Sequence, residues 1–344
     1  EKVRGSKPIH AAKGYYDGLD GIVSFHPFYM LPYANTCRWD THCGPYYGVI
    51  YEFLCETPET WLEDTNRSQS GNPIPAAHTM ARAPGANDAV TTMFTLAKTA
   101  RDHMLPHSGT WTVNETILAS GQATADNLPA QMAQIMYAIR APSRAMLDKI
   151  LAVLDRTAEA AALAAHCTVK KHWVSKSRQG LANHAMARRT FENLKRVGAP
   201  HFDEAAIKAA HEIQKELGLS PIVKPFIDEI ERLIDPEEAE KKIRAEIPAW
   251  QTHYTSDDYT DMTWHAPTVR LYIGRPALKA PAGFTYPDWV MNALGGMNAT
   301  IDPMVNKAAK TIGLTLFDII ADPEFRTSTR KEFEERTGGG IGGT

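Results

Sequence analysis

The histidine at position 26 has a sequence context that favours chemistry. His26 stands directly before Pro27 and ends the run Gly-Ile-Val-Ser-Phe at 21–25, which is typical of a buried strand. In α/β folds, functional side chains lie at strand ends, and an imidazole there is available for metal binding or proton transfer. The structural alternative is a hydrogen-bonded core histidine.

A second candidate is Asp302, which precedes Pro303 and a run of Ala, Ile and Leu at helical spacing up to residue 320. An Asp in front of a helix is a natural N-cap, because its carboxylate accepts from the first free backbone N–H groups. The same carboxylate could ligate a metal ion, and the pattern leaves both roles open.

Two further groups favour structure over chemistry. Asp258 and Asp261 lie three apart in a polar loop, where such pairs are usually turn and cap residues. His42 and Cys43 are adjacent but have no metal-binding spacing, so we assign them to a structural loop.

Regular elements must position these residues. Alternating or continuous apolar residues predict strands, and apolar residues at helical spacing predict helices. The expected order between 48 and 175 is β-α-β-β-α-β: strand 48–55, helix 87–103, strands 110–119 and 131–140, helix 144–166 and strand 167–175. This order is the ferredoxin-like arrangement of a four-stranded antiparallel sheet with two helices on one face.

Strands and helices of another kind flank that unit. We expect strands at 18–28 and 268–274 and helices at 184–195, 203–217, 224–247 and 303–320. The simplest account is an α/β domain interrupted by an inserted α+β domain. The expected boundaries are 1–46 and 178–344 for the α/β domain and 47–177 for the insertion.

Composition narrows the function. The formal net charge of −3 offers no basic excess for a phosphate backbone, so we expect no nucleic-acid partner. No apolar run reaches the roughly 20 residues that span a bilayer, so we expect no membrane partner. The four Cys form no C-x-x-C pair, which favours a reducing, cytoplasmic location. The start at Glu1 and the Gly-rich end at 337–344 suggest a piece of a longer chain.

Several segments, in order, resemble the M20 family of metal-dependent amidohydrolases and peptidases, nearest to its aminobenzoyl-glutamate hydrolase and aminoacylase types. The matching segments are GIVSFHP at 21–27, AAH at 76–78 with AV at 89–90, DNLPA at 126–130, YAIRAP at 137–142 and SDDYTDMTW at 256–264. The resemblance implies a metallopeptidase-like α/β catalytic domain with an inserted ferredoxin-like lid and dimerisation domain.

The resemblance also implies a divalent transition metal (Mn, Zn or Co), one or two ions, with His26 and Asp302 as ligands. Glu1 resembles the family's general base. Lys2 stands where relatives carry a metal-ligating Glu, and the family's upstream His/Asp motif has no match. A protonated Lys does not ligate a metal, so this departure favours a single ion held by a mixed His and carboxylate set.

Substrate contacts follow from the same resemblance. His78 would stabilise the oxyanion of the neighbouring subunit in a homodimer or higher homo-oligomer. Asn127 and Arg140 would hold a substrate carboxylate, Arg140 through its bidentate fork. Their structural alternatives are a loop histidine, a turn residue and a surface ion pair, respectively.

The expected function is metal-assisted hydrolysis of a C–N bond in a small, carboxylate-bearing substrate, with an aromatic substrate as one option. The bond is an amide, or an aromatic amine as in the family's 5-nitroanthranilate aminohydrolase branch. The alternative is an inactive fragment, or a binding and dimerisation protein, of the same fold.

Overall fold

The computed structural model describes residues 6–28, 34–56, 84–103, 111–121 and 129–339. The chain forms two compact units. Unit 1 comprises Glu1–Ile9, Gly44–Gln179 and Thr255–Asp258, and unit 2 comprises His10–Cys43, Gly180–Tyr254 and Tyr259–Thr344. The expected lid and dimerisation role of 47–177 stays a prediction.

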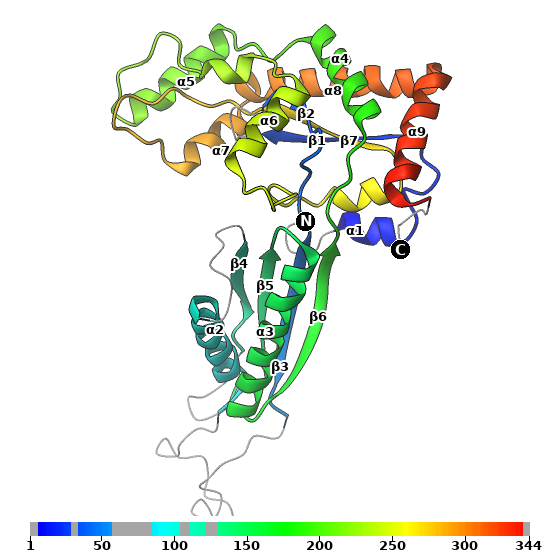
Figure 1. The fold of residues 1–344 in the computed structure, drawn as a ribbon. Coiled ribbons are helices and arrows are strands. Elements are labelled where there is room, and N and C mark those ends of the chain that lie inside the picture. Colours follow the sequence, from blue (N-terminus) through cyan, green and yellow to red (C-terminus); the bar gives the residue numbers. More distant parts are fainter. Residues whose placement is uncertain (1–5, 29–33, 57–83, 104–110, 122–128, 340–344) are drawn as a thin grey trace, which may run out of the picture. The chain divides into compact units, whose positions relative to one another are not determined.

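Unit 1 contains the expected β-α-β-β-α-β order (Figure 1). Its elements are β3 (Tyr46–Leu54), α2 (Ala86–His103), β4 (Thr112–Ala119), β5 (Met132–Arg140), α3 (Arg144–Ala164) and β6 (Thr168–Ser177). The strands form one sheet in the order β4-β5-β3-β6, and every neighbouring pair is antiparallel. This is the strand order of a ferredoxin-like unit, so that prediction is confirmed.

Alternation along the strands produces the core of unit 1. Every second residue of β3 and of β5 points to the two helices, and α2 and α3 add their apolar stripes to one cluster. The fully buried strand residues are Tyr47, Val49, Tyr51, Phe53, Ala133, Ile135, Tyr137 and Ile139. Ser143 caps α3 by accepting a hydrogen bond from the Met146 backbone N–H.

Unit 2 is built around a second, three-stranded sheet in the order β1-β7-β2. Strand β1 (Ile22–Phe28) runs parallel to β7 (Thr268–Gly274), and β2 (Thr36–Cys37) is antiparallel to β7. Helix α1 (Ser6–Ala12) begins in unit 1 and ends in unit 2. The other helices in the described part of unit 2 are α4 (His184–Val197), α5 (Glu204–Glu216), η1 (Asp228–Glu231), α6 (Pro236–Glu246), η2 (Thr260–Trp264), α7 (Asp288–Gly296), α8 (Asn298–Ala321) and α9 (Pro323–Thr337).

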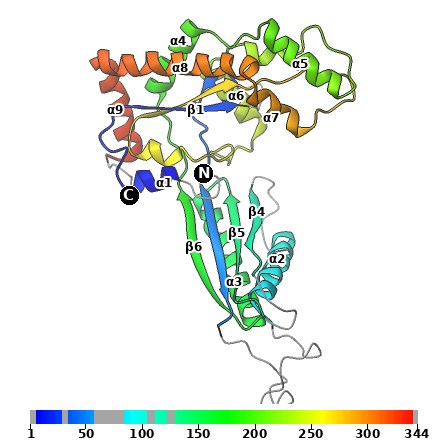
Figure 2. The same cartoon turned by 180° about the vertical axis from the view of Figure 1, so that it is seen from behind.

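The two faces of this small sheet differ in chemistry. Val23, Phe25, Val269, Leu271 and Ile273 point to one face and pack against α4 and α8. In both views α4 and α8 lie on the same side of the strands (Figures 1 and 2). The side chains between them, Ser24, His26, Arg270 and Tyr272, point to the other face because successive residues of a strand alternate. We call this second surface the polar face.

Two predictions about helices are corrected. The expected helix 224–247 is interrupted, because η1 ends at Glu231 and α6 begins only at Pro236. Asp235 caps α6, and a proline fits the first helical turn but not a helix interior. The expected helix 303–320 begins earlier, at Asn298, so Asp302 and Pro303 lie inside α8. No described helix is both long and apolar enough to cross a membrane.

Candidate functional site

His26 lies on the polar face of unit 2, paired in register with Tyr272 of β7. The side chain is exposed, and its Nδ1 lies 2.6 Å from the Pro27 carbonyl oxygen. A carbonyl only accepts, so Nδ1 carries a proton, and in the neutral imidazole the lone pair is then on Nε2. A neutral imidazole in this tautomer is able to ligate a metal ion or accept a proton.

Asp302 lies in another environment. It is exposed in the second turn of α8, and that helix begins at Asn298 after Met297, so the expected N-cap role is wrong. Thr300 and Met304 mark the buried side of α8, and Asp302, midway between them, falls on the opposite side. Since α8 packs against the apolar face of the sheet, the structure does not bring Asp302 to the surface that bears His26.

The described residues do not by themselves fit a metal centre. Among them, no three His, Cys, Asp or Glu side chains come close enough to hold an ion. Glu1, Lys2, His78 and Asn127 lie outside the described residues. A metal role for His26 therefore needs ligands from those other parts of the chain.

Arg140, the last residue of β5, is half-buried in unit 1. Arg140 is the residue opposite Tyr46 in the antiparallel pair of β3 and β5. Its guanidinium lies 5.1 Å from the centre of the Tyr46 ring. Burial raises the pKa of Tyr46, and the charge of Arg140 acts in the other direction. The guanidinium is thus held against an aromatic ring at a strand end, a position from which it could bind a carboxylate.

The two loop carboxylates have separate environments. Asp258 in unit 1 forms an ion pair with Lys7 at 2.5 Å, and Asp261 in unit 2 is buried in η2.

Sequence reasoning missed a buried polar cluster on the polar face, which we define as Arg38, His42, Tyr259, Arg270 and Tyr272. None of the five is more than 3% exposed. Arg38 follows β2, and its backbone N–H donates to the Arg270 carbonyl at 2.9 Å, so the two arginines are neighbours across the sheet. The alternation of Thr268, Arg270 and Tyr272 in TVRLYIG (268–274) is the available signal, because it places these polar side chains on one face of the strand.

Aromatic rings surround both guanidinium groups of the cluster. Arg38 lies 5.0 Å from the Tyr272 ring centre, and Arg270 lies 4.4 Å from that of Tyr259. Arg270 also donates to Ser24 Oγ at 2.5 Å. Cation–π contacts of this kind partly replace the hydration that a buried guanidinium loses.

Burial keeps His42 neutral. Its Nδ1 lies 2.6 Å from the Tyr259 hydroxyl, and its Nε2 is buried without a hydrogen-bond partner within the structure. Burial first, and then the charge of Arg38, lowers the pKa of His42 to about 3. Burial likewise lowers the pKa of His253. The cluster thus holds a neutral imidazole beside two cationic arginines, a combination that disfavours a bound dication.

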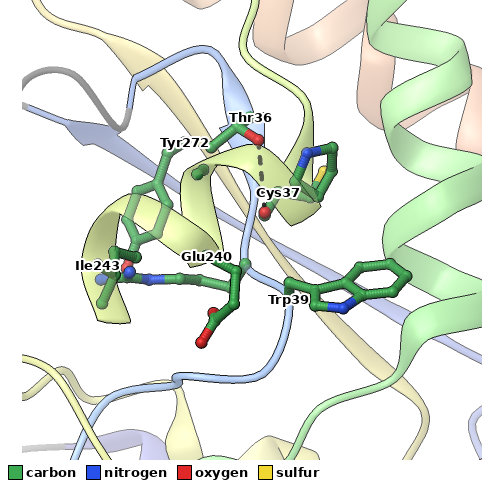
Figure 3. Close-up of a pocket in the computed structure, with 9 residues that line it drawn as sticks. Thr36, Cys37, Trp39, Glu240, Ile243 and Tyr272 are labelled. Atoms are coloured by element: carbon green, nitrogen blue, oxygen red, sulfur yellow. Dashed lines mark hydrogen bonds between the residues drawn. The ribbon is translucent and has the colours of Figure 1, made fainter. Parts of the chain in front are cut away.

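A pocket lies beside this cluster, between β2, β7 and α6 (Figure 3). Glu240 of α6 and Tyr272 of β7 line it together with Trp39. The Glu240 carboxylate accepts hydrogen bonds from the backbone N–H groups of Asp40 at 3.2 Å and Thr41 at 2.9 Å, and from the Thr41 hydroxyl. Its acceptor capacity is thus used to hold the turn after β2, which makes it a structural carboxylate.

No protein-family profile matches the chain, and no curated protein matches it in sequence. Among solved structures, an aminobenzoyl-glutamate utilization protein from Klebsiella pneumoniae aligns with a TM-score of 0.45 and 12% identity, over 88% of this chain and 56% of its own. A putative aminohydrolase from Staphylococcus aureus aligns with a TM-score of 0.42 and 11% identity, over 88% of this chain and 60% of its own. A hydantoinase/carbamoylase family amidase from Burkholderia vietnamiensis aligns with a TM-score of 0.37 and 11% identity, over 86% of this chain and 54% of its own.

The chain spans little more than half the length of these matched structures. It is a mixed α/β protein with two sheets.

Proposed function

We propose that this chain is part of an M20-type metal-dependent hydrolase that cleaves a C–N bond, an amide or an aromatic amine, in a small carboxylate-bearing substrate. One observation carries the proposal. A ferredoxin-like unit interrupts an α/β unit whose β1 strand carries His26-Pro27 in its last residues, which is the arrangement that the ordered sequence motifs imply.

The proposal assigns metal binding to unit 2 and binding of the substrate carboxylate to unit 1. His26 presents Nε2 from the polar face of unit 2, where it would ligate the metal together with residues outside the described part of the chain. Arg140, held against Tyr46 in unit 1, would bind the substrate carboxylate with Asn127. Glu1 as general base, His78 as oxyanion donor and a homodimer formed through unit 1 complete the proposal.

Metal content with a matched pair of histidine variants tests the proposal. The purified chain is loaded with Mn²⁺, Zn²⁺ or Co²⁺, and bound metal is measured after gel filtration together with hydrolysis of N-acyl and N-aminobenzoyl amino acids and of nitroanthranilates. About one ion per chain is expected, and His26→Ala should weaken metal binding by at least 10-fold and abolish turnover. His201→Ala is the control, because that side chain is 85% exposed and lies in the same unit.

If His26→Ala kept both its metal and its activity, the assignment of the ligand would be wrong. If neither wild type nor variant bound metal, the second candidate function would be favoured.

That second candidate is a binding protein of the same fold without catalysis. It is favoured by the lack of a metal-competent group among the described side chains. Calorimetric titration with an aromatic carboxylate separates the two functions: a binding protein retains affinity without metal and loses it in Arg140→Ala. Arg140→Lys keeps the charge but not the fork, so a partial loss there indicates bidentate recognition.

A further inference from the structure

Two cysteines of unit 1 stand opposite each other at one end of the β3–β6 ladder. The last rung of this antiparallel pair joins Leu54 to Thr168, and Cys55 and Cys167 are the next residue outward on either strand. Figure 1 shows the two strands side by side. Opposed residues of an antiparallel pair have Cα atoms about 4.5–5.5 Å apart, within the roughly 4.4–6.8 Å that a disulfide spans.

Hydrogen bonds hold both backbones in place at this rung. The Cys55 N–H donates to the Gln131 carbonyl at 2.8 Å, which fixes the end of β3 to the start of β5. The Cys167 N–H donates to the Ala162 carbonyl at 2.9 Å, which fixes the entrance to β6 to the end of α3. A bond between the sulfurs therefore needs side-chain rotation and no change of register.

Both thiols are present in reduced form, and they are neighbours. Cys55 is buried, and its Sγ lies 3.8 Å from the Pro84 carbonyl oxygen. Cys167 is half-buried, and its Sγ lies 3.2 Å from the Ala165 carbonyl oxygen. Burial, and then the adjacent Cys55 thiol, raises the pKa of Cys167 to about 12. Thiolate is thus scarce at neutral pH, so the pair reacts slowly there and faster as the pH rises.

We propose that Cys55 and Cys167 are an oxidation site, in which a small-molecule disulfide of the glutathione type converts the two thiols into one intramolecular disulfide. The Cys167 thiolate attacks the oxidant, whose S–S bond breaks and releases one thiolate. Cys55 then loses its proton and attacks the Cys167 sulfur, which releases the second. The protein loses two protons and two electrons, and the oxidant is reduced to two thiols.

The product would tie β3 to β6 across the whole segment that contains α2, β4, β5 and α3. A cross-link over so long a segment restricts the unfolded chain, so the midpoint of thermal unfolding should rise by about 5–10 °C. This inference does not depend on the proposed hydrolase activity.

Oxidation of the full chain by oxidised glutathione at pH 8.5 tests the proposal. Intact mass under non-reducing, denaturing conditions should fall by about 2 Da, for the two hydrogens lost, and return with dithiothreitol. Non-reducing peptide mapping should yield a single linked pair containing Cys55 and Cys167.

Cysteine variants provide the matched controls. Cys37→Ser should keep the mass loss, because Cys37 is buried in unit 2. Cys167→Ser and Cys55→Ala should both abolish it and leave the unfolding midpoint unchanged by the oxidant.

Three results would overturn the proposal: a stable glutathione adduct on Cys167 with Cys55 still free, a link that involves Cys37 or Cys43, or no reaction of the folded protein while the urea-unfolded chain is oxidised. The wild-type peptide map decides among them even if a variant fails to fold.

Discussion

The two sheets of this protein differ in what they bury. In unit 1, the helix-facing side of β3 and β5 is apolar, and two of its buried tyrosines donate their hydroxyls to carboxylates of α3: Tyr47 to Asp148 at 2.8 Å and Tyr51 to Asp155 at 2.6 Å. In unit 2, one face is equally apolar, but the other buries Arg38 and Arg270.

Removing a guanidinium from water costs several kcal/mol unless contacts replace the lost hydration. Unit 1 avoids this cost, and unit 2 meets it with tyrosine rings and hydrogen bonds. The ferredoxin-like unit is therefore explained by packing alone, whereas the polar face of unit 2 is not, and the polar face also carries His26.

The largest expected effect tests the packing of unit 1. Leu154→Ala should cost about 2–5 kcal/mol, because Leu154 is 1% exposed and the truncation leaves a cavity. Leu163→Ala on the same helix is the control and should change stability by less than about 0.5 kcal/mol, since that side chain is 81% exposed. Hydrogen exchange by mass spectrometry, read on peptides of 132–177, reports the loss within unit 1; equal effects of the two variants would contradict this packing.

The next effect tests the buried charges of unit 2 through pH. The pKa of His42 is about 3 when folded and 6.5 in its ordinary state, so between these values the unfolded chain binds a proton that the folded chain does not. The contribution of His42 to the free energy of unfolding is therefore present in full above pH 6.5 and is lost as the pH falls towards 3. At pH 5 the loss from this group is about 2 kcal/mol.

Urea unfolding at pH 7.5 and pH 5 measures this loss. His42→Asn retains an amide near the Tyr259 hydroxyl and should flatten the pH dependence by about 2 kcal/mol. His201→Asn, exposed in the same unit, should leave it unchanged. A pH dependence that survives His42→Asn in full would assign the loss to other groups, with His253 first.

Two tyrosine hydroxyls allow a direct comparison of the units. Tyr51→Phe should cost about 1 kcal/mol, because Asp155 still accepts from Lys171 at 2.7 Å. Tyr259→Phe should cost about 2 kcal/mol, because it removes the hydroxyl partner of a fully buried imidazole nitrogen, Nδ1 of His42. Denaturant midpoints measure both, and a reversed order would place the more demanding polar contact in unit 1.

The last comparison concerns two helix caps, one of which has the smallest expected effect. Asn183 caps α4 through Oδ1 and donates from Nδ2 to the Thr329 carbonyl at 2.9 Å while buried, whereas Ser143 caps α3 at an exposed position. Asn183→Ala should cost about 1.5 kcal/mol and Ser143→Ala about 0.5 kcal/mol. Asn183→Ser keeps a capping hydroxyl and removes the second bond, so its unfolding midpoint should fall between those of wild type and Asn183→Ala; a midpoint equal to that of wild type would show that the bond to Thr329 adds nothing.

Of the candidate site, little was predictable. The strand that leads to His26 was expected, but its tautomer depends on the Pro27 carbonyl, which only the folded backbone places. The N-cap role of Asp302 failed because α8 begins at Asn298 and takes Pro303 into its second turn. The interruption of the expected helix 224–247 had a visible signal, Asp235 before Pro236, which the strong charge periodicity of the segment obscured.

The sequence by itself determined the local elements. The alternation of 131–140 and the Ala/Leu periodicity of 144–166 are properties of neighbouring residues, so β5, α3 and the whole β-α-β-β-α-β order could be predicted from the chain. Only the tertiary structure decided which strands pair, because pairing between segments far apart in the chain leaves no local periodicity. It is the pairing of β2 with β7 that sets Arg38 beside Arg270, and the pairing of β3 with β6 that sets Cys55 opposite Cys167.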